Sequence, residues 1–191
     1  QEKYRRPGQR VAHALQTNGT ALDDDWCRFL ARHGFLVGLS LDGPPHLHDH
    51  YRTDRRGGGS HAQVMRGLDL LRKHRVEHNI LCVLNDKNVR HPDEVYRYLL
   101  NLGPRHLQFI PAIEWVADPH REGERVLAPF SPSGAAYGEF LCRVFDHWFD
   151  QSRTQVSIRF FDTVLNKLVH GRSVCCITGE ALKNAPWKAT P

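Results

Sequence analysis

The chain has 191 residues, of which 40% are hydrophobic and 25% charged, as expected of one globular domain with a substantial core. Its net charge is +5, but the basic residues are scattered among acidic ones, which argues against a nucleic-acid partner. No apolar run approaches the length of a membrane span, and no secretory leader is recognisable. Five cysteines without the spacing of a disulfide framework favour a reducing, cytoplasmic setting.

Strands and helices are predicted to alternate along most of the chain. Short apolar runs predict strands at residues 11–15, 35–41, 77–84, 106–111 and 156–160. Helical periodicity and capping residues predict helices at residues 23–33, 60–72, 92–102, 133–148 and 161–169. Residues 112–132 are predicted to form a long loop. This alternation favours an α/β fold with a parallel sheet, in which ligand contacts gather at the carboxyl ends of the strands.

Residues 36–54 carry the first candidate binding site. An apolar run ends at the sequence DGPP, because glycine permits a sharp turn and the prolines withhold the N–H groups that a sheet needs. Ser40 and Asp42 share a face at this strand end, and Arg52 follows in a segment predicted to be a loop. A hydroxyl and a guanidinium so placed predict a clamp for a carboxylate or a phosphate.

Two further polar segments adjoin predicted strands or helices. Gln16 and Asn18 follow the first strand, at the kind of strand end where α/β proteins place ligand contacts. The three glycines at residues 57–59 are not followed by the Gly-Lys-Ser/Thr of a phosphate loop, so they are predicted to form a flexible connector. Ser60 is predicted to cap the helix that comes next.

Four motifs follow one another along the chain: QTNGT, VGLSLDGPPHLHDHYRTD, VMRGLDLLRKH and LQFIPAIE. Together they resemble the radical S-adenosylmethionine enzymes, and within these the anaerobic sulfatase-maturating enzymes, which carry a C-terminal auxiliary-cluster domain of the SPASM type. The SLDGP…HD…R run is the most specific part. The resemblance extends over nearly the whole chain, to about Cys175.

The resemblance implies a partial (β/α)6 barrel, incomplete at its N-terminal end, that holds S-adenosylmethionine on a 4Fe-4S cluster. One electron from the cluster would release a 5′-deoxyadenosyl radical, which abstracts hydrogen from a cysteine or serine of a sulfatase and leads to formylglycine. The implied partners are a sulfatase polypeptide and a reductant such as flavodoxin or ferredoxin.

The resemblance also implies roles for particular residues. Ser40 and Arg52 match positions that contact the methionyl carboxylate and ribose of S-adenosylmethionine. Ile113 matches an apolar residue near the adenine, and Gln16 and Asn18 face the same barrel mouth. Cys175 matches the first cysteine of the auxiliary cluster.

The sequence departs from the family pattern at both ends. The CxxxCxxC motif of the radical cluster does not occur, and Cys27, Cys82 and Cys142 are predicted to be inert core thiols on a helix, a strand and another helix. We expect residues 1–170 to be a barrel core without its first βα unit. Residues 171–191 are expected to begin a truncated or divergent SPASM region, with the catalytic base beyond the chain. The expectation is a fragment that is inactive by itself.

Two alternatives stay open at this stage. His46, His48 and His50 alternate beside the DGPP turn and could bind zinc in a metal-dependent hydrolase if the segment is extended, although a solvated loop is favoured. The second alternative is a non-catalytic barrel remnant that binds a small molecule or a protein partner without turnover.

Overall fold

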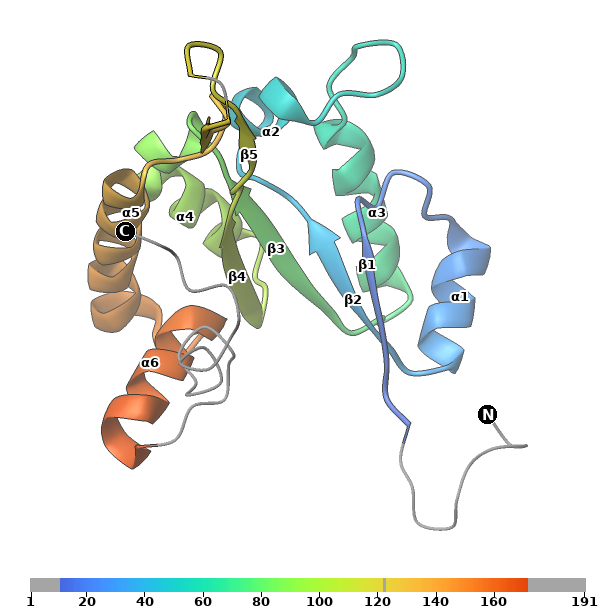
Figure 1. Cartoon of the computed structure of the whole chain (residues 1–191). Coiled ribbons are helices and arrows are strands. Elements are labelled where there is room, and N and C mark those ends of the chain that lie inside the picture. Colours follow the sequence, from blue (N-terminus) through green and yellow to red (C-terminus); the bar gives the residue numbers. More distant parts are fainter. Residues whose placement is uncertain (1–10, 122, 172–191) are drawn as a thin grey trace. The chain divides into compact units, whose positions relative to one another are not determined.

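The computed structural model describes residues 11–121 and 123–171, and it is built on a five-stranded parallel sheet with strand order β1-β2-β3-β4-β7 (Figure 1). The strands of this sheet are β1 (His13–Thr17), β2 (Phe35–Ser40), β3 (His78–Leu84), β4 (His106–Pro111) and β7 (Ser157–Ile158). The chain divides into two compact units, residues 1–81 and 82–191, and each is described by itself below. The α/β class and the parallel sheet expected from the sequence are confirmed.

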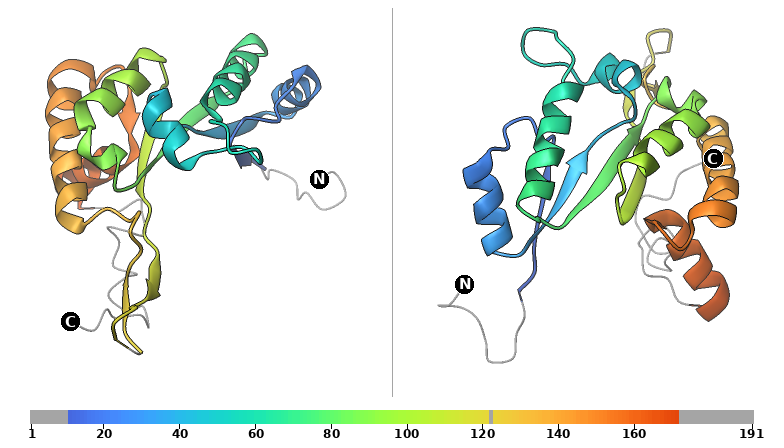
Figure 2. Two further views of the ribbon diagram at one scale, coloured as in Figure 1. Left: turned by 90° about the horizontal axis from the view of Figure 1, so that it is seen from above. Right: turned by 180° about the vertical axis from the view of Figure 1, so that it is seen from behind.

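The first unit packs helices against one face of β1 and β2. Its helices are α1 (Asp24–Arg32), α2 (Pro45–Tyr51) and α3 (His61–Lys73), and Figure 2 shows α1 and α3 on the same side of the strands. The Asp23 side chain caps α1 by accepting a hydrogen bond from the N–H of Trp26 at 2.8 Å. Val37 and Leu39 of β2, and Leu41 directly after it, alternate along the chain and are fully buried.

The opposite face of β1 and β2 carries small and polar residues toward the carboxyl ends of the strands. Gln16 pairs in register with Gly38, which is followed on the same face by Ser40. A Cβ atom at Gly38 would come within 2.4 Å of a Leu81 methyl group and 3.2 Å of the Gln16 side chain. Glycine therefore lets side chains of the neighbouring strands close over the middle of β2, while Ser40 stays partly exposed at the strand end.

The second unit places helices around β4 and β7. Its helical segments are the short 3₁₀ helix η1 (Asn88–Arg90), α4 (Pro92–Asn101), α5 (Gly134–His147), the short π-helix η2 (Trp148–Ser152) and α6 (Arg159–His170). Ser133 caps α5 as predicted, because its hydroxyl accepts the N–H of Ala136 at 3.2 Å. Trp148 donates its indole N–H to the Val156 carbonyl at 2.7 Å, which ties the end of α5 to the start of β7.

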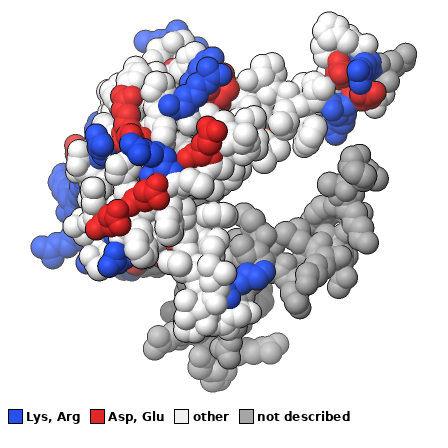
Figure 3. Space-filling model, turned by 90° about the vertical axis from the view of Figure 1, so that its left-hand side faces the viewer, with Lys and Arg blue, Asp and Glu red and all other residues white. Residues whose placement is uncertain are grey.

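The outer face of α4 and α5 carries both signs of charge (Figure 3). Arg143 on α5 donates to both carboxylate oxygens of Asp93 on α4 at 2.9 and 3.1 Å, and His147 contacts the same carboxylate at 2.8 Å. Ion pairs of this kind join neighbouring helices without building a field of one sign.

Two segments predicted to be loops have regular structure. Residues 45–51 form α2, because Pro45 at its first turn has a φ already suited to a helix and needs no N–H partner there. The long loop predicted at residues 112–132 contains an antiparallel hairpin of β5 (Trp115–Ala117) and β6 (Arg125–Leu127). The first strand is also shifted, so that Gln16 lies inside β1 rather than after it.

The cysteine predictions are partly confirmed. Cys27 on α1 and Cys82 on β3 are buried, as expected of core thiols. The prediction for Cys142 was wrong: it is exposed, because α5 turns that residue away from its apolar face. Cys175 and the predicted auxiliary region lie outside the described residues. Within residues 11–121 and 123–171, no helix is long and apolar enough to span a membrane.

Candidate functional site

The carboxyl end of β2 is closed by an ion pair between Asp42 and Arg52. Arg52 donates from Nε to one carboxylate oxygen and from Nη2 to the other at 3.2 Å. The Asp42 side chain is only 4% exposed and that of Arg52 is 25% exposed. The sequence predicted both residues at this strand end, but it paired Arg52 with an incoming anion and gave Asp42 no partner.

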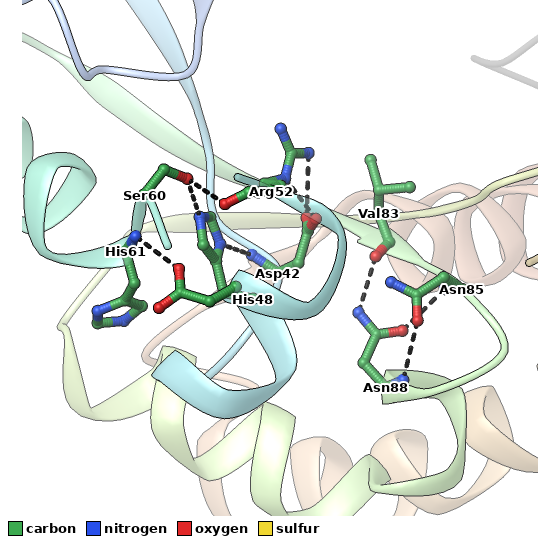
Figure 4. A network of polar contacts seen from close by, with 9 residues as sticks. Asp42, His48, Arg52, Ser60, His61, Val83, Asn85 and Asn88 are labelled. Atoms are coloured by element: carbon green, nitrogen blue, oxygen red, sulfur yellow. Dashed lines mark hydrogen bonds and ion pairs between the residues drawn. The ribbon is translucent and has the colours of Figure 1, made fainter. Parts of the chain in front are cut away.

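His48 on α2 bridges this strand end to the start of α3. Its Nδ1 accepts the backbone N–H of Asp42 at 3.1 Å, and its Nε2 lies 3.2 Å from the Ser60 hydroxyl. Figure 4 shows the imidazole between these two partners. Because Nδ1 accepts, the neutral ring carries its proton on Nε2 and donates it to Ser60.

Ser60 completes a closed ring of four residues, which we call the β2 ring: Asp42, His48, Arg52 and Ser60. The Ser60 hydroxyl donates to the Arg52 carbonyl at 2.8 Å, and the Ser60 N–H donates to the same oxygen at 3.1 Å. Ser60 occupies the cap position of α3 as predicted, but its side chain makes no capping hydrogen bond. Its hydroxyl serves the β2 ring instead.

Asp49 supplies the cap that Ser60 does not. Its carboxylate accepts the N–H of His61, the first residue of α3, at 2.8 Å. A Cβ atom at Gly59 would lie 2.2 Å from the Asp49 carboxyl carbon, so this approach requires glycine. The glycine run predicted as a flexible connector thus closes a narrow turn, in which Thr53 and Gly59 form an antiparallel bridge.

Burial governs the two histidines of this region. Burial lowers the pKa of His48 to about 4, and the nearby Asp42 carboxylate offsets only part of that effect. Burial also lowers the pKa of His61, whose ring lies 5.5 Å from that of His48. Both imidazoles are therefore neutral at physiological pH, as the hydrogen bonds of His48 require.

The guanidinium of Arg52 retains capacity for a ligand. A guanidinium has five N–H donors, and Asp42 takes two of them, leaving three on Nη1 and Nη2. Two of these three, one on Nη1 and one on Nη2, lie on the edge that binds a carboxylate end-on with two parallel hydrogen bonds. The site can therefore hold an anion while Asp42 keeps the arginine in place.

The face of the sheet opposite the helices carries two further polar groups, Ser40 and Asn79. Ser40 is partly exposed, and no hydrogen bond joins it to Arg52 in the described part of the chain. Asn79 pairs in register with Gly38, and its buried Oδ1 has no hydrogen-bond partner among the residues described. An orphaned acceptor of this kind suits the donor group of a bound ligand.

The remaining candidate residues differ in their exposure and in their hydrogen-bond partners. Gln16 is exposed, whereas Asn18 uses its Oδ1 to accept the N–H and hydroxyl of Thr20 at 3.2 and 3.0 Å, which forms a turn. Ile113 follows β4 in the second unit and is 61% exposed. The structure brings Arg52 and Asp42 together.

The three histidines proposed as zinc ligands do not converge. On helix α2, His46 and His50 lie on one face while His48 lies on the other and is fully buried. Within residues 11–121 and 123–171, no group of three or more His, Cys, Asp or Glu side chains is placed to hold a metal ion. The structure therefore contradicts a zinc site made of these three histidines.

The sequence did not reveal the roles of His48 and Ser60 in the β2 ring, and it did not single out Asn79. Ser60 and His48 are 12 positions apart, and their contact depends on the turn that brings α3 back to α2. The only sequence signal was a histidine three residues after a helix-starting proline, and such histidines are also common on solvated surfaces. Asn79 lies near the start of a strand that reads as apolar.

A protein-family model for the radical SAM superfamily matches residues 2–99, which is half of the chain. The chain belongs to the radical SAM superfamily. Within the superfamily, it is 38% identical over 175 residues to the serine-type anaerobic sulfatase-maturating enzyme of Bacteroides thetaiotaomicron, covering 86% of this chain and 42% of the relative. It is also 38% identical over 181 residues to the cysteine-type enzyme of Clostridium novyi, covering 93% and 47%.

Solved structures with the same fold also match this chain. A structure of native anSMEcpe with bound AdoMet superposes with a TM-score of 0.82 at 35% identity, covering 92% of this chain and 47% of that one. A structure of the same protein with bound AdoMet and a Cp18Cys peptide gives 0.79 at 36% identity, covering 88% and 46%. The chain spans about half the length of the relatives and structures that it matches.

Proposed function

We propose that this chain forms the cofactor-binding part of an anaerobic sulfatase-maturating enzyme, which oxidises an active-site cysteine or serine of a sulfatase to formylglycine. Support comes from the similarity to maturating enzymes and from a guanidinium held, with one edge free, at the carboxyl end of β2. The identity is 38% to a serine-type and 38% to a cysteine-type relative, so the proposal includes both substrates.

The residues at the end of β2 fit the polar part of S-adenosylmethionine. The free edge of Arg52 suits the methionyl carboxylate, and Ser40 offers a partly exposed hydroxyl at the end of β2. The orphaned Oδ1 of Asn79 suits a ligand hydroxyl or ammonium donor. S-adenosylmethionine, when bound, supplies the group that abstracts hydrogen from the substrate, while these residues bind and orient it.

Three further residues are proposed to contact the cofactor. Gln16 lies on the same sheet face as Ser40 and has an exposed amide. Asn18 has its Oδ1 committed to Thr20, so only its NH₂ group is proposed to face the ligand. Ile113 is exposed and apolar, as a contact for adenine would be.

The described residues do not fit a 4Fe-4S cluster. Cys27 and Cys82 are buried, Cys142 is exposed on α5, and no group of three suitable ligands occurs among the described residues. We therefore propose that these residues bind S-adenosylmethionine without cleaving it. Turnover, with a sulfatase peptide and a reductant such as flavodoxin or ferredoxin, is proposed for an enzyme that also supplies the cluster.

Calorimetric titration of the chain with S-adenosylmethionine tests this proposal. Arg52→Lys keeps the positive charge but removes the planar fork, so we expect affinity to fall by about 1.5–3 kcal/mol, the range for hydrogen bonds to charged groups. Arg55→Lys is the matched control, because Arg55 is an exposed arginine in the same turn. Equal affinity of Arg52→Lys and the unchanged chain would remove Arg52 from the site.

A further inference from the structure

The β2 ring contains two residues, His48 and Ser60, that are not proposed to contact the cofactor. His48 is fully buried and Ser60 is 7% exposed. Each makes hydrogen bonds in two directions: His48 toward Asp42 and Ser60, and Ser60 toward His48 and Arg52. Through these bonds, His48 and Ser60 connect the backbone of Asp42 to the backbone of Arg52 (Figure 4).

We infer that His48 and Ser60 are positioning residues that hold the Arg52 guanidinium in the orientation that leaves its end-on edge open to a ligand. The inference deepens the proposed function, because the ligand in question is S-adenosylmethionine. Neither residue is inferred to touch that ligand.

The backbone of Arg52 is fixed by Ser60. The Arg52 carbonyl accepts two hydrogen bonds from Ser60, one from the hydroxyl and one from the backbone N–H. The Arg52 N–H donates to the His48 carbonyl at 3.1 Å, so both backbone polar groups of Arg52 have partners within the ring. The turn between Arg52 and Ser60 is itself closed by the Thr53–Gly59 bridge, which limits how far Arg52 can move without Ser60.

The carboxylate side of the ion pair is fixed by His48. Its Nδ1 accepts the Asp42 N–H directly after β2, at the point where the backbone turns away from the sheet. An imidazole ring holds its acceptor and its donor at opposite ends of a rigid plane. It therefore couples the Asp42 backbone to the Ser60 hydroxyl at a fixed separation.

Two amide variants separate the two bonds of His48. Asn can place an acceptor near the position of Nδ1 but cannot reach Ser60, whereas Gln can place a donor near Nε2 but leaves the Asp42 N–H without its acceptor. Ser60→Ala removes the shared hydroxyl and keeps the Ser60 N–H bond to Arg52. Ile80→Val is the matched control, because it trims a buried residue of β3 in the same unit that contributes no side-chain bond to the ring.

The first experiment compares affinity for S-adenosylmethionine by calorimetry. We expect Ser60→Ala, His48→Asn and His48→Gln to bind about 3- to 10-fold more weakly than the unchanged chain. Ile80→Val should keep full affinity even if its melting temperature is equal to or lower than that of the three ring variants. Loss of affinity in Ile80→Val equal to that in Ser60→Ala would overturn the inference, because general destabilisation would then explain both. Unchanged affinity in Ser60→Ala and both His48 variants would also overturn it.

The second experiment observes the arginine without any ligand. The Nε–H of Arg52 is bonded to Asp42, so its NMR signal should exchange slowly with water in the unchanged chain and in Ile80→Val. We expect exchange at least several-fold faster in Ser60→Ala and His48→Asn. If the unchanged chain fails to bind S-adenosylmethionine, the proposed function falls while this exchange rate still decides the inference: faster exchange supports it and equal exchange overturns it.

Discussion

The carboxyl ends of β2 and β3 are closed by polar side chains in two different ways (Figure 4). After β3, Asn85 and Asn88 direct the hydrogen bonds of their side chains to backbone groups: Asn85 Oδ1 accepts the N–H of Lys87 and of Asn88, Asn88 Oδ1 accepts that of Asn85, and Asn88 donates to Val83. After β2, the β2 ring joins side chains to one another through an ion pair and a buried imidazole.

The difference lies in what each closure leaves available. The asparagines are neutral at every ordinary pH, and their amide groups are engaged with nearby backbone. The β2 ring contains a charge with an open edge and a histidine that can titrate. Polar residues at a strand end are therefore not equivalent: we assign the first set to structure and the second to ligand binding.

Arg52→Ala should have the largest effect on stability among the single substitutions considered. It leaves the nearly buried Asp42 carboxylate without its cationic partner, and because Arg52 is partly exposed we expect a loss of about 2–4 kcal/mol rather than the full cost of a buried charge. Urea unfolding measures this value. The double variant Asp42→Asn with Arg52→Ala should recover part of the loss, and strict additivity of the two substitutions would contradict the account.

Acid should destabilise the β2 ring through His48. Its pKa is about 4 in the folded chain and near 6.5 when unfolded, so the unfolded state takes up the proton first as pH falls. The stabilisation is present above pH 6.5 and is lost as pH falls toward 4. The shift corresponds to about 3 kcal/mol, which solvent screening reduces to about 2 kcal/mol. The lowered pKa of His61 acts in the same direction. Urea unfolding at pH 7.5 and 4.5 should show this loss, and His48→Asn should reduce it; an unchanged slope in that variant would exclude His48 as the cause.

Asn88→Ala tests the other closure. It removes the acceptor of the Asn85 N–H and the donor to the Val83 carbonyl, and we expect a loss of about 1–3 kcal/mol, since buried groups are left unsatisfied. The loss should be the same at pH 7.5 and 5.5, because no titrating group takes part. A strong pH dependence of this loss would erase the distinction between the two strand ends.

Ser40→Ala should have the smallest effect, and only on binding. Its hydroxyl makes no hydrogen bond to Arg52, so the free energy of unfolding should change by less than about 0.5 kcal/mol. Affinity for S-adenosylmethionine should fall by about 0.5–1.5 kcal/mol, the usual value of one neutral hydrogen bond. Calorimetry and urea unfolding of the same preparation separate the two quantities.

Local patterns predicted the main framework of the fold. The strand expected at residues 106–111 is β4, and Ser133 caps α5 as its side chain suggested. Hydrophobic period and capping act over a few neighbouring residues, so they can be recognised without tertiary information. The helix at residues 45–51 was missed because its polar histidines resemble a loop, and it is stabilised by buried Leu47 and His48.

The candidate site could be predicted only in part, because some of its contacts depend on the tertiary fold. Ser40, Asp42 and Arg52 could be placed at a strand end, because parallel strands put their carboxyl ends at one edge. The partner of Arg52 could not be predicted. Whether this guanidinium binds the Asp42 carboxylate or a ligand depends on how α2 and the following turn bring the chain back to the end of β2. His48 was judged a solvated histidine, and it is instead fully buried.

The central claim is that S-adenosylmethionine binds at the carboxyl end of β2 through the free edge of Arg52. A crystal structure of the chain soaked with S-adenosylmethionine tests it most directly. We predict the methionyl carboxylate on Nη1 and Nη2 of Arg52, with the Nε–H still bonded to Asp42 and the β2 ring unchanged. A carboxylate bound elsewhere, or one that displaces Asp42 from Arg52, would contradict the account.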